Sequence, residues 1–172
     1  MLVCAIIGFG KMGQIRAKSI LKSGRGQIKW IYDPHIKETS FKANLTNDLD
    51  VIFQDPNVQA VFICTPNYKI PLLTIKALDS NKNVFAEKPP GFTSKDVEMI
   101  MKSEAKYKKK CMFGFNHRHH ESILKMKEIV DSGKLGKILW MRGRYGKEVD
   151  KKFFESWRAD PEKSGAGILL DQ

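Results

Sequence analysis

Six residues near the amino terminus have the types and the spacing of a turn that binds phosphate. They form the pattern G-x-G-x-x-G and consist of Gly8, Phe9, Gly10, Lys11, Met12 and Gly13. In such a turn the first glycine permits a tight bend, the second lets backbone amides approach a pyrophosphate, and the third lets the next helix pack closely. The amino end of that helix then faces the anion. A purely structural glycine turn is the alternative.

Asp33 lies twenty residues after Gly13, at the end of the next apolar run. A carboxylate at this place in a dinucleotide-binding unit accepts hydrogen bonds from the hydroxyls of the adenosine ribose. It also repels a 2′-phosphate, because both groups are negative. The sequence therefore predicts that the cofactor is NAD, with NADP disfavoured.

Thr65, Pro66 and Asn67 follow the apolar run 59–64. Pro66 excludes Thr65 from the helical region, so the chain turns where the expected strand ends. The carboxyl ends of parallel strands form the edge at which α/β sheets bind ligands. This segment is either part of such a ligand-binding edge or an ordinary strand-ending turn.

Glu87 and Lys88 follow another apolar run, 83–86, and are expected at the same carboxyl edge. Held close to a substrate hydroxyl, the Lys88 ammonium would stabilise alkoxide character as hydride leaves for a cofactor. An ion pair between Lys88 and Glu87 at the surface is the alternative interpretation.

Short apolar runs that alternate with helical patterns are expected to position these residues. We expect strands at 2–7, 28–32, 59–64, 83–86 and 110–115, and helices at 12–22, 47–54, 69–80, 94–108 and 119–132. The strand-like runs lack a clean apolar and polar alternation, which is typical of parallel strands buried on both faces. The pattern predicts an α/β fold with a doubly wound parallel sheet. Region 34–46 is weakly patterned, and we expect a short helix there and a short strand near Phe41.

The character of the sequence changes after Asn116. Residues 137–146 alternate like a half-buried strand, with Ile138 and Trp140 on one face and Leu139 and Met141 on the other. Such a pattern is typical of an antiparallel sheet. We therefore predict a first domain at 1–117 and the beginning of a second, α+β domain with a mainly antiparallel sheet at 118–172.

Composition excludes several classes of protein. With 172 residues, 42% of them hydrophobic and 28% charged, the chain can bury one good core, so a disordered or fibrous protein is not expected. The net charge of +11 could suit nucleic acid, but the densest basic run, Lys106 and 108–110, sits at an expected helix end without interleaved aromatic residues. We expect a solvated helix end there, and neither a nucleic-acid partner nor a membrane span or signal peptide.

Three cysteines lie in apolar runs without C-x-x-C spacing: Cys4, Cys64 and Cys111. They are interpreted as buried reduced thiols of a cytoplasmic protein. His117, His119 and His120 could suggest a metal site, but no cysteine or carboxylate is spaced to complete one. No metal is therefore predicted.

In this order along the chain, seven segments resemble those of the Gfo/Idh/MocA family, which includes glucose-fructose oxidoreductase and inositol 2-dehydrogenase. They are the glycine turn at 8–13, Thr65 to Asn67, Glu87 to Pro89, Gly114 to Arg118, Gly136 to Ile138, Trp157 with Arg158, and Gly165 to Asp171. The resemblance implies an NAD-dependent oxidoreductase with an amino-terminal Rossmann domain. It further implies a sugar, nucleotide-sugar or cyclitol substrate, and a homo-oligomer for an intact homologue.

The resemblance also implies roles for individual residues. Lys88 would lie beside the nicotinamide on a Lys-Pro bond that is commonly cis in such enzymes, and Asp171 would be the active-site aspartate. Residues expected to contact the cofactor are the glycine turn, Asp33, Thr65, Pro66, Asn67, Glu87 and Lys88. Residues expected to shape the substrate pocket are Asn116, Arg118, Trp157 and Arg158.

In this family the aspartate is usually followed four residues later by a histidine that acts as the general base. That position would be residue 175, whereas the sequence ends at Gln172. We therefore interpret the sequence as truncated or as a fragment, in which cofactor binding by about the first 116 residues is expected to survive. The alternative function is a catalytically incomplete dinucleotide-binding module or sensor.

Overall fold

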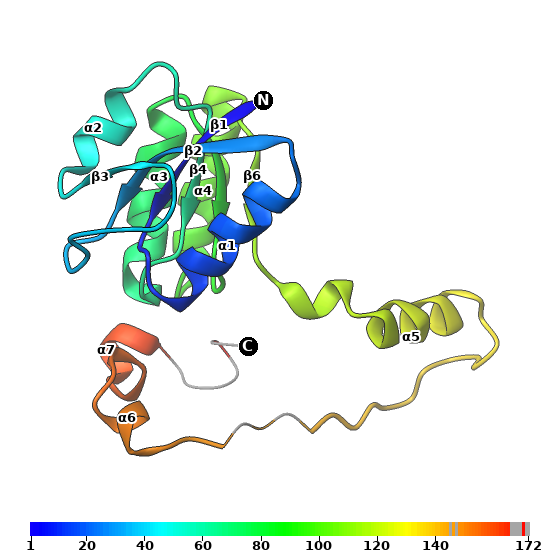
Figure 1. Cartoon of the computed structure of the whole chain (residues 1–172). Helices are drawn as coiled ribbons and strands as arrows, with labels where there is room; N and C mark the ends of the chain where they lie inside the picture. Colours follow the sequence, from blue (N-terminus) through cyan, green and yellow to red (C-terminus); the bar gives the residue numbers. More distant parts are fainter. Residues whose placement is uncertain (145, 147, 166–169, 171–172) are drawn as a thin grey trace.

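A computed structural model of the chain describes residues 1–144, 146, 148–165 and 170. Six parallel strands form one sheet in the order β3-β2-β1-β4-β5-β6 (Figure 1). Their bounds are β1 Leu2–Ile7, β2 Gly26–Tyr32, β3 Asn44–Thr46, β4 Ala60–Ile63, β5 Asn83–Ala86 and β6 Cys111–Phe113. The predicted doubly wound parallel sheet is thereby confirmed. Among the described residues, no helix is both long and apolar enough to cross a lipid bilayer.

Four helices connect the strands: α1 Lys11–Lys22, α2 Leu49–Gln54, α3 Ile70–Asp79 and α4 Ser94–Tyr107. They create a separate core on each face of the sheet. In β1 the side chains alternate between these cores, with Cys4 and Ile6 in the α1 cluster and Ala5 and Ile7 in the cluster of α2, α3 and α4. Burial on both faces is the reason that the strands read as unbroken apolar runs.

Region 34–43 contains no helix, so that expectation is wrong, while a strand does follow it as β3. The cause is local hydrogen bonding that competes with a helix. The Asp33 carboxylate accepts from the amide of His35, and the Thr39 hydroxyl accepts from the amide of Phe41. The Phe41 ring then packs edge-on against Phe9, with 5.5 Å between the ring centroids.

After β6 the described residues form five further helical elements: η2 Asn116–His119, α5 Glu121–Asp131, α6 Lys151–Phe154, η3 Trp157–Ala159 and α7 Pro161–Ser164. The strand expected at 137–146 is wrong for the residues that are described there, 137–144 and 146, which adopt no strand. A strand requires a neighbour that shares its hydrogen bonds, and alternation alone does not supply one. Trp140 is 76% exposed and Leu139 is 84% exposed, so neither of the two expected faces is buried at these positions.

A carboxylate whose side chain is only 9% exposed ties β2 to the segment that precedes β4. Asp55 forms an ion pair with Lys29 at 2.6 Å and accepts hydrogen bonds from the Trp30 indole at 2.7 Å and the Asn57 amide at 2.9 Å. Its backbone carbonyl accepts from the Lys82 ammonium at 2.6 Å. Burial by itself would raise the pKa of the Asp55 carboxyl, but the hydrogen bonds outweigh burial and hold that pKa well below its ordinary value.

We expect Asp55→Asn to lower the free energy of unfolding by about 2 kcal/mol near neutral pH, because it weakens charge-assisted hydrogen bonds at a buried site. Since the folded pKa lies below the unfolded value of about 3.9, the stabilisation is present above about pH 4 and is lost as the pH falls further. Urea titrations between about pH 7 and pH 3 check this, and the difference between the two proteins should shrink toward the acidic end.

The matched control is Asp50→Asn, because Asp50 pairs with Lys76 at 2.8 Å but both side chains are about half exposed. Its cost should stay below about 1 kcal/mol. Equal costs for the two substitutions would contradict the role assigned to Asp55.

Candidate functional site

The candidate site lies where the strand order reverses, between the carboxyl ends of β1 and β4. Helix α1 follows β1 on one face of the sheet and α3 follows β4 on the other, which opens a crevice between them. Gly8, directly after β1, has a φ of +88°, and a Cβ there would come within 2.7 Å of the Cys64 carbonyl oxygen. Only glycine therefore fits where the first turn packs against the end of β4.

The other two glycines differ in what surrounds them. A Cβ on Gly13 would overlap the carbonyl oxygen of Gly8, so α1 can approach the turn only without a side chain there. A Cβ on Gly10 would meet no described atom within 4 Å. The turn thus has a closed side that is packed on the protein and an open side at Gly10, where a ligand has room.

The amino end of α1 suits an anion. Gly10 is its N-cap, and within the described chain no side chain caps it and no acidic residue lies in its first turn. The first amides of a helix have no partner inside the helix, so those of Lys11 and Met12 are available to an acceptor. Together with the helix dipole, they provide the setting that a pyrophosphate group requires.

Asp33 follows β2 and lies directly against the glycine turn. One of its carboxylate oxygens accepts from the Phe9 amide at 2.7 Å, and the other accepts from the His35 amide at 2.9 Å. The Phe9 side chain is buried under the turn, so only the backbone of this predicted cofactor-binding residue lies at the turn surface. Asp33 therefore holds the turn in place, a role that the sequence analysis did not anticipate.

The residues after β4 bring a distant part of the chain to the same edge. Asn67 begins the short helix η1, Asn67–Lys69, and is buried. Its side-chain amide donates to the carbonyl oxygen of Ser164 at 3.3 Å, so α7 packs against η1. The Thr65 hydroxyl, just after β4, is buried and has no hydrogen-bond partner in the described part of the chain.

Glu87 and Lys88 follow β5, and the Lys88–Pro89 peptide bond is cis, as the family resemblance implies. Glu87 is only 7% exposed, and its carboxylate pairs with the Arg16 guanidinium from α1 at 2.6 Å. The Glu87 carboxylate thus belongs to a largely buried ion pair with Arg16. The sequence analysis had considered a different partner for it, Lys88, in an ion pair at the surface.

Arg16 is a site residue that the sequence analysis missed. Its signal was present in the spacing, because residues 13, 16, 17 and 20 share one side of a helix. Gly13, Ala17 and Ile20 are buried on that side. An arginine within such a stripe requires a buried partner, and the partner follows 71 residues later as Glu87.

The four predicted substrate residues are positioned differently. Asn116 begins η2, and its side-chain oxygen accepts from Arg16 at 3.1 Å, which places it beside the Glu87 pair. The guanidinium of Arg118 lies 5.7 Å from the Phe115 ring, and that of Arg158 lies 4.4 Å from the Trp157 ring. These cation–π contacts are with neighbours in sequence, so they do not bring Arg118, Trp157 and Arg158 together.

The carboxyl-terminal segment returns to this edge of the sheet, where α7 lies in Figure 1. A Cβ on Gly165 would come within 3.0 Å of the Phe92 ring, so residue 165 packs against the loop that follows Lys88. Asp171, the predicted active-site aspartate, lies outside the described residues. Across those residues, no group of three or more histidine, cysteine, aspartate or glutamate side chains is arranged to hold a metal ion.

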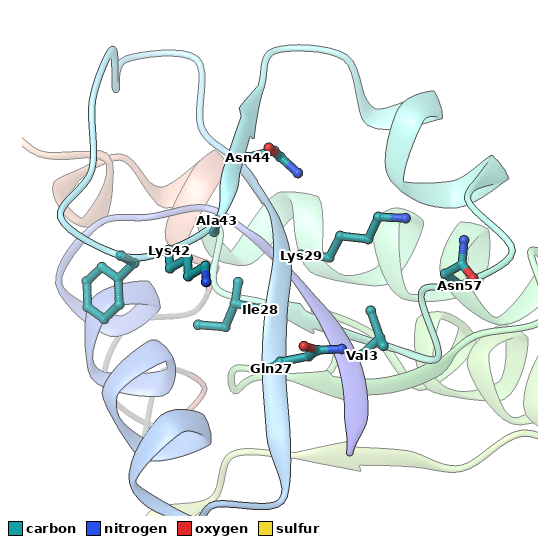
Figure 2. Close-up of a pocket in the computed structure, with 9 residues that line it drawn as sticks. Val3, Gln27, Ile28, Lys29, Lys42, Ala43, Asn44 and Asn57 are labelled. Carbon is teal, nitrogen blue, oxygen red and sulfur yellow. The ribbon is translucent and has the colours of Figure 1, made fainter.

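A hollow of about 650 Å³ lies elsewhere (Figure 2). It opens beside the first half of β2, because β3 pairs only with Trp30 to Tyr32 and leaves Gly26 to Lys29 without a neighbour on that edge. Its walls include Ile28, Lys42 and Asn44 and none of the predicted site residues. The crevice at the glycine turn, supported by its geometry and its donors, is therefore the candidate site.

Comparison with known proteins gives two family matches. Residues 2–115 match a family described as "Oxidoreductase family, NAD-binding Rossmann fold", and residues 123–172 match the "GFO/IDH/MocA C-terminal domain". Among curated proteins, inositol 2-dehydrogenase of Salmonella typhimurium is 27% identical over 153 residues, which is 84% of this chain and 46% of that protein. The 2,7-anhydro-N-acetylneuraminate hydratase of Mediterraneibacter gnavus is 26% identical over 95% of this chain and 45% of that protein.

Solved structures give the same result. Myo-inositol 2-dehydrogenase from Lactobacillus plantarum superposes with a TM-score of 0.83 at 28% identity, covering 99% of this chain and 52% of that one. The chain thus spans less than half the length of the two curated relatives named above.

The thiols of this region give a testable property. Burial raises the pKa of Cys4 to about 11 and that of Cys111 to about 12. At Cys64 burial, together with the negative charge of Glu87, raises the pKa to about 12, while Arg16 acts in the opposite direction. All three are free cysteines, but only Cys4 is buried, whereas Cys64 and Cys111 are partly buried, so the expected burial is confirmed for Cys4 alone. Thiols with such raised pKa values remain protonated at neutral pH.

We expect the three native thiols to react with an aromatic disulfide reagent near pH 8 at least about tenfold more slowly than a free thiol, because the thiolate is the reactive form. The measurement is the absorbance time course in buffer and in denaturing guanidinium chloride, where all three should react at once. A Lys18→Cys variant, which adds an exposed thiol on α1, serves as the fast control. Equally fast labelling of all four thiols would contradict the burial described above.

Proposed function

Because the chain belongs to the GFO/IDH/MocA family of oxidoreductases, we propose that it takes part in hydride transfer between a hydroxyl-bearing carbon of a sugar-like substrate and NAD. The observation that carries this proposal is the position of three groups at one edge of the sheet. They are the open side of the glycine turn at Gly10, the Asp33 carboxylate, and the loop of Lys88. Similarity to inositol dehydrogenases supports a sugar, nucleotide sugar or cyclitol as the substrate.

Binding of the dinucleotide is assigned to backbone and carboxylate groups. The amides of Lys11 and Met12 at the start of α1 bind the pyrophosphate, with Gly10 leaving room for it. Asp33 accepts hydrogen bonds from the adenosine ribose, because each of its oxygens retains a second lone pair beside its contact with a backbone amide. Its charge excludes a 2′-phosphate, which favours NAD over NADP. Thr65, Pro66 and Asn67 line the crevice next to the turn.

Lys88 is assigned to the reacting end of the site. When bound, NAD supplies the carbon that accepts or returns the hydride. The Lys88 ammonium lies beside the substrate oxygen. It stabilises the negative charge on that oxygen while the hydride leaves, or returns to, the carbon that bears it. Asp171 is proposed as the second catalytic residue, and Asn116, Arg118, Trp157 and Arg158 as residues that shape the pocket, all by resemblance to the family.

A dinucleotide-binding module without its own catalysis is the second candidate. The contacts of the cofactor-side residues favour it, since Gly8, Asp33 and Glu87 are joined to the site by packing, hydrogen bonds or an ion pair. By contrast, the ring contacts of Arg118 and Arg158 stay within their own segments. A bound sugar that changes neither NADH fluorescence nor the redox state of the cofactor would favour this candidate.

Further properties follow from the same family. Three free thiols favour a reducing compartment such as the cytoplasm. Exposed apolar side chains on α5, among them Leu124 and Met126, favour a homo-oligomer of the kind expected for an intact homologue. The positive net charge is not assigned to a nucleic-acid partner.

The first test is the Gly10→Val substitution. Gly10 has an ordinary φ of −66° and open space before it, so a valine fits the fold but fills the place of the pyrophosphate. We expect the wild-type chain to bind NADH with a micromolar dissociation constant and the variant to bind at least about tenfold more weakly, a loss of about 1.4 kcal/mol. Isothermal titration calorimetry measures both, and circular dichroism checks the fold. A wild-type chain that binds no NADH would contradict the proposal.

The second test is Asp33→Arg, which replaces the repelling carboxylate with a cation. We expect the ratio of NADP to NAD affinity to rise by at least about tenfold, because like charges brought together cost several kcal/mol. Since Asp33 also holds the Phe9 amide, the ratio of the two affinities is the proper readout, and Asp33→Asn is the control for the lost contact. An unchanged ratio would remove Asp33 as the residue that selects the cofactor.

A further inference from the structure

We propose that Arg16 is a positioning residue, whose buried ion pair with Glu87 fixes the loop that carries Lys88 against helix α1. The inference rests on the proposed function, because it concerns the same cofactor and the same lysine. The inference adds that this ion pair fixes the distance between the two ends of the site, the glycine turn and Lys88.

The pair joins three elements by the contacts of one guanidinium. The Nε and Nη2 atoms of Arg16 lie 2.7 Å and 2.6 Å from the same Glu87 oxygen. Nη2 also donates to the Asn116 side-chain oxygen at 3.1 Å. Arg16 belongs to α1, Glu87 directly follows β5, and Asn116 begins η2. One side chain therefore fixes the starts of two loops relative to the helix that follows the glycine turn.

The residues around the ion pair leave space for both charged groups. The Arg16 guanidinium lies 4.7 Å from the centre of the ring of Phe85, which belongs to β5 and precedes Glu87 by two residues. A Cβ on Gly114 would come within 3.1 Å of Arg16 Nη2 and 3.2 Å of Glu87 Oε2. Glycine at this position leaves the space that the two charged groups occupy. The side chains of Arg16 and Glu87 are only 15% and 9% exposed.

Stability alone does not account for such a pair. Removing two charges from water is costly, and apolar residues of similar volume are often equally stabilising at such a site. What a charged pair supplies and an apolar pair does not is fixed direction, through hydrogen bonds with defined geometry. Lysine at position 16 could not reproduce them, because a single ammonium cannot present the planar set of donors that reaches Glu87 and Asn116 together.

The pair thereby links the two ends of the proposed site. Arg16 lies six residues after Gly10 within the rigid helix whose amino end faces the pyrophosphate. Lys88 is the residue next to Glu87, so the ion pair fixes its backbone position. A cofactor that is bound at the glycine turn then meets the lysine at a distance set by a helix and an ion pair.

The experiment compares the wild-type chain with Arg16→Met, Arg16→Lys and the double variant Arg16→Met/Glu87→Met. Lys18→Met, which removes an exposed cation from the same helix, is the matched control. The first readout is the dissociation constant of NADH. The second is amide hydrogen exchange by mass spectrometry of the peptides that contain residues 9–16 and 87–93, which needs no cofactor.

We expect Arg16→Met to weaken NADH binding by about 10- to 100-fold, the range that follows the loss of a group that orients a binding residue. Exchange should rise in both peptides and stay unchanged in β1 and β4. Arg16→Lys should restore the fold but not the affinity. The double variant leaves no buried unpaired charge, so it should fold even if the single variant does not, and it should keep the binding defect.

Wild-type affinity in the folded double variant would overturn the proposal, because the pair would then be only structural. Exchange in the two peptides that matches the Lys18→Met control would overturn it as well. If the wild-type chain itself binds no NADH, the proposed function fails, and the exchange readout alone decides the positioning role. A rise confined to the two peptides then supports that role, and no rise overturns it.

Discussion

The contact between the backbone of Gly8 and the carbonyl of Cys64 determines where the rest of the site lies. A side chain at Gly8 would push β1 and β4 apart at the point where the strand order reverses. The approach of these two strand ends sets where α1 begins, and the direction of α1 sets where its free amides and its core-facing residues lie. Asp33 fixes the same turn from the other side through the Phe9 amide. A small region of close backbone packing thus supports groups from four different elements.

Two carboxylates with largely buried side chains, Asp55 and Glu87, hold opposite ends of the sheet by different contacts. Asp55, ahead of β4, binds Lys29, the Trp30 indole and the Asn57 amide, and its backbone carbonyl accepts from Lys82. Glu87, after β5, binds the single guanidinium of Arg16. The first arrangement is closed and fully partnered, as expected for a structural anchor. The second connects to helix α1, which follows the glycine turn, and the candidate site is assigned to that end.

Most of the sheet could be predicted from sequence because its strands are buried on both faces, which leaves unbroken apolar runs such as 2–7. The glycine turn and the position of Asp33 next to it could also be predicted, since the residues of this motif lie close together in the sequence. Two expectations were wrong for different reasons, one local and one that depends on distant residues. A helix within 34–43 was excluded by side chains that cap nearby amides, and a strand at 137–146 required a partner strand. Arg16 was missed for a related reason, because its partner lies 71 residues away.

The contact between Asn67 and Ser164 joins residues that are 97 positions apart in the chain. During synthesis at about 5 to 20 residues per second, the end of β4 is therefore complete roughly 5 to 20 seconds before Ser164 is made. The sheet can assemble in this interval, since every strand among the described residues lies before residue 114. Helix α7, which contacts Asn67 through Ser164, is thus added to a sheet edge that already exists and has no part in starting the fold. This addition carries the entropic cost of closing a long loop.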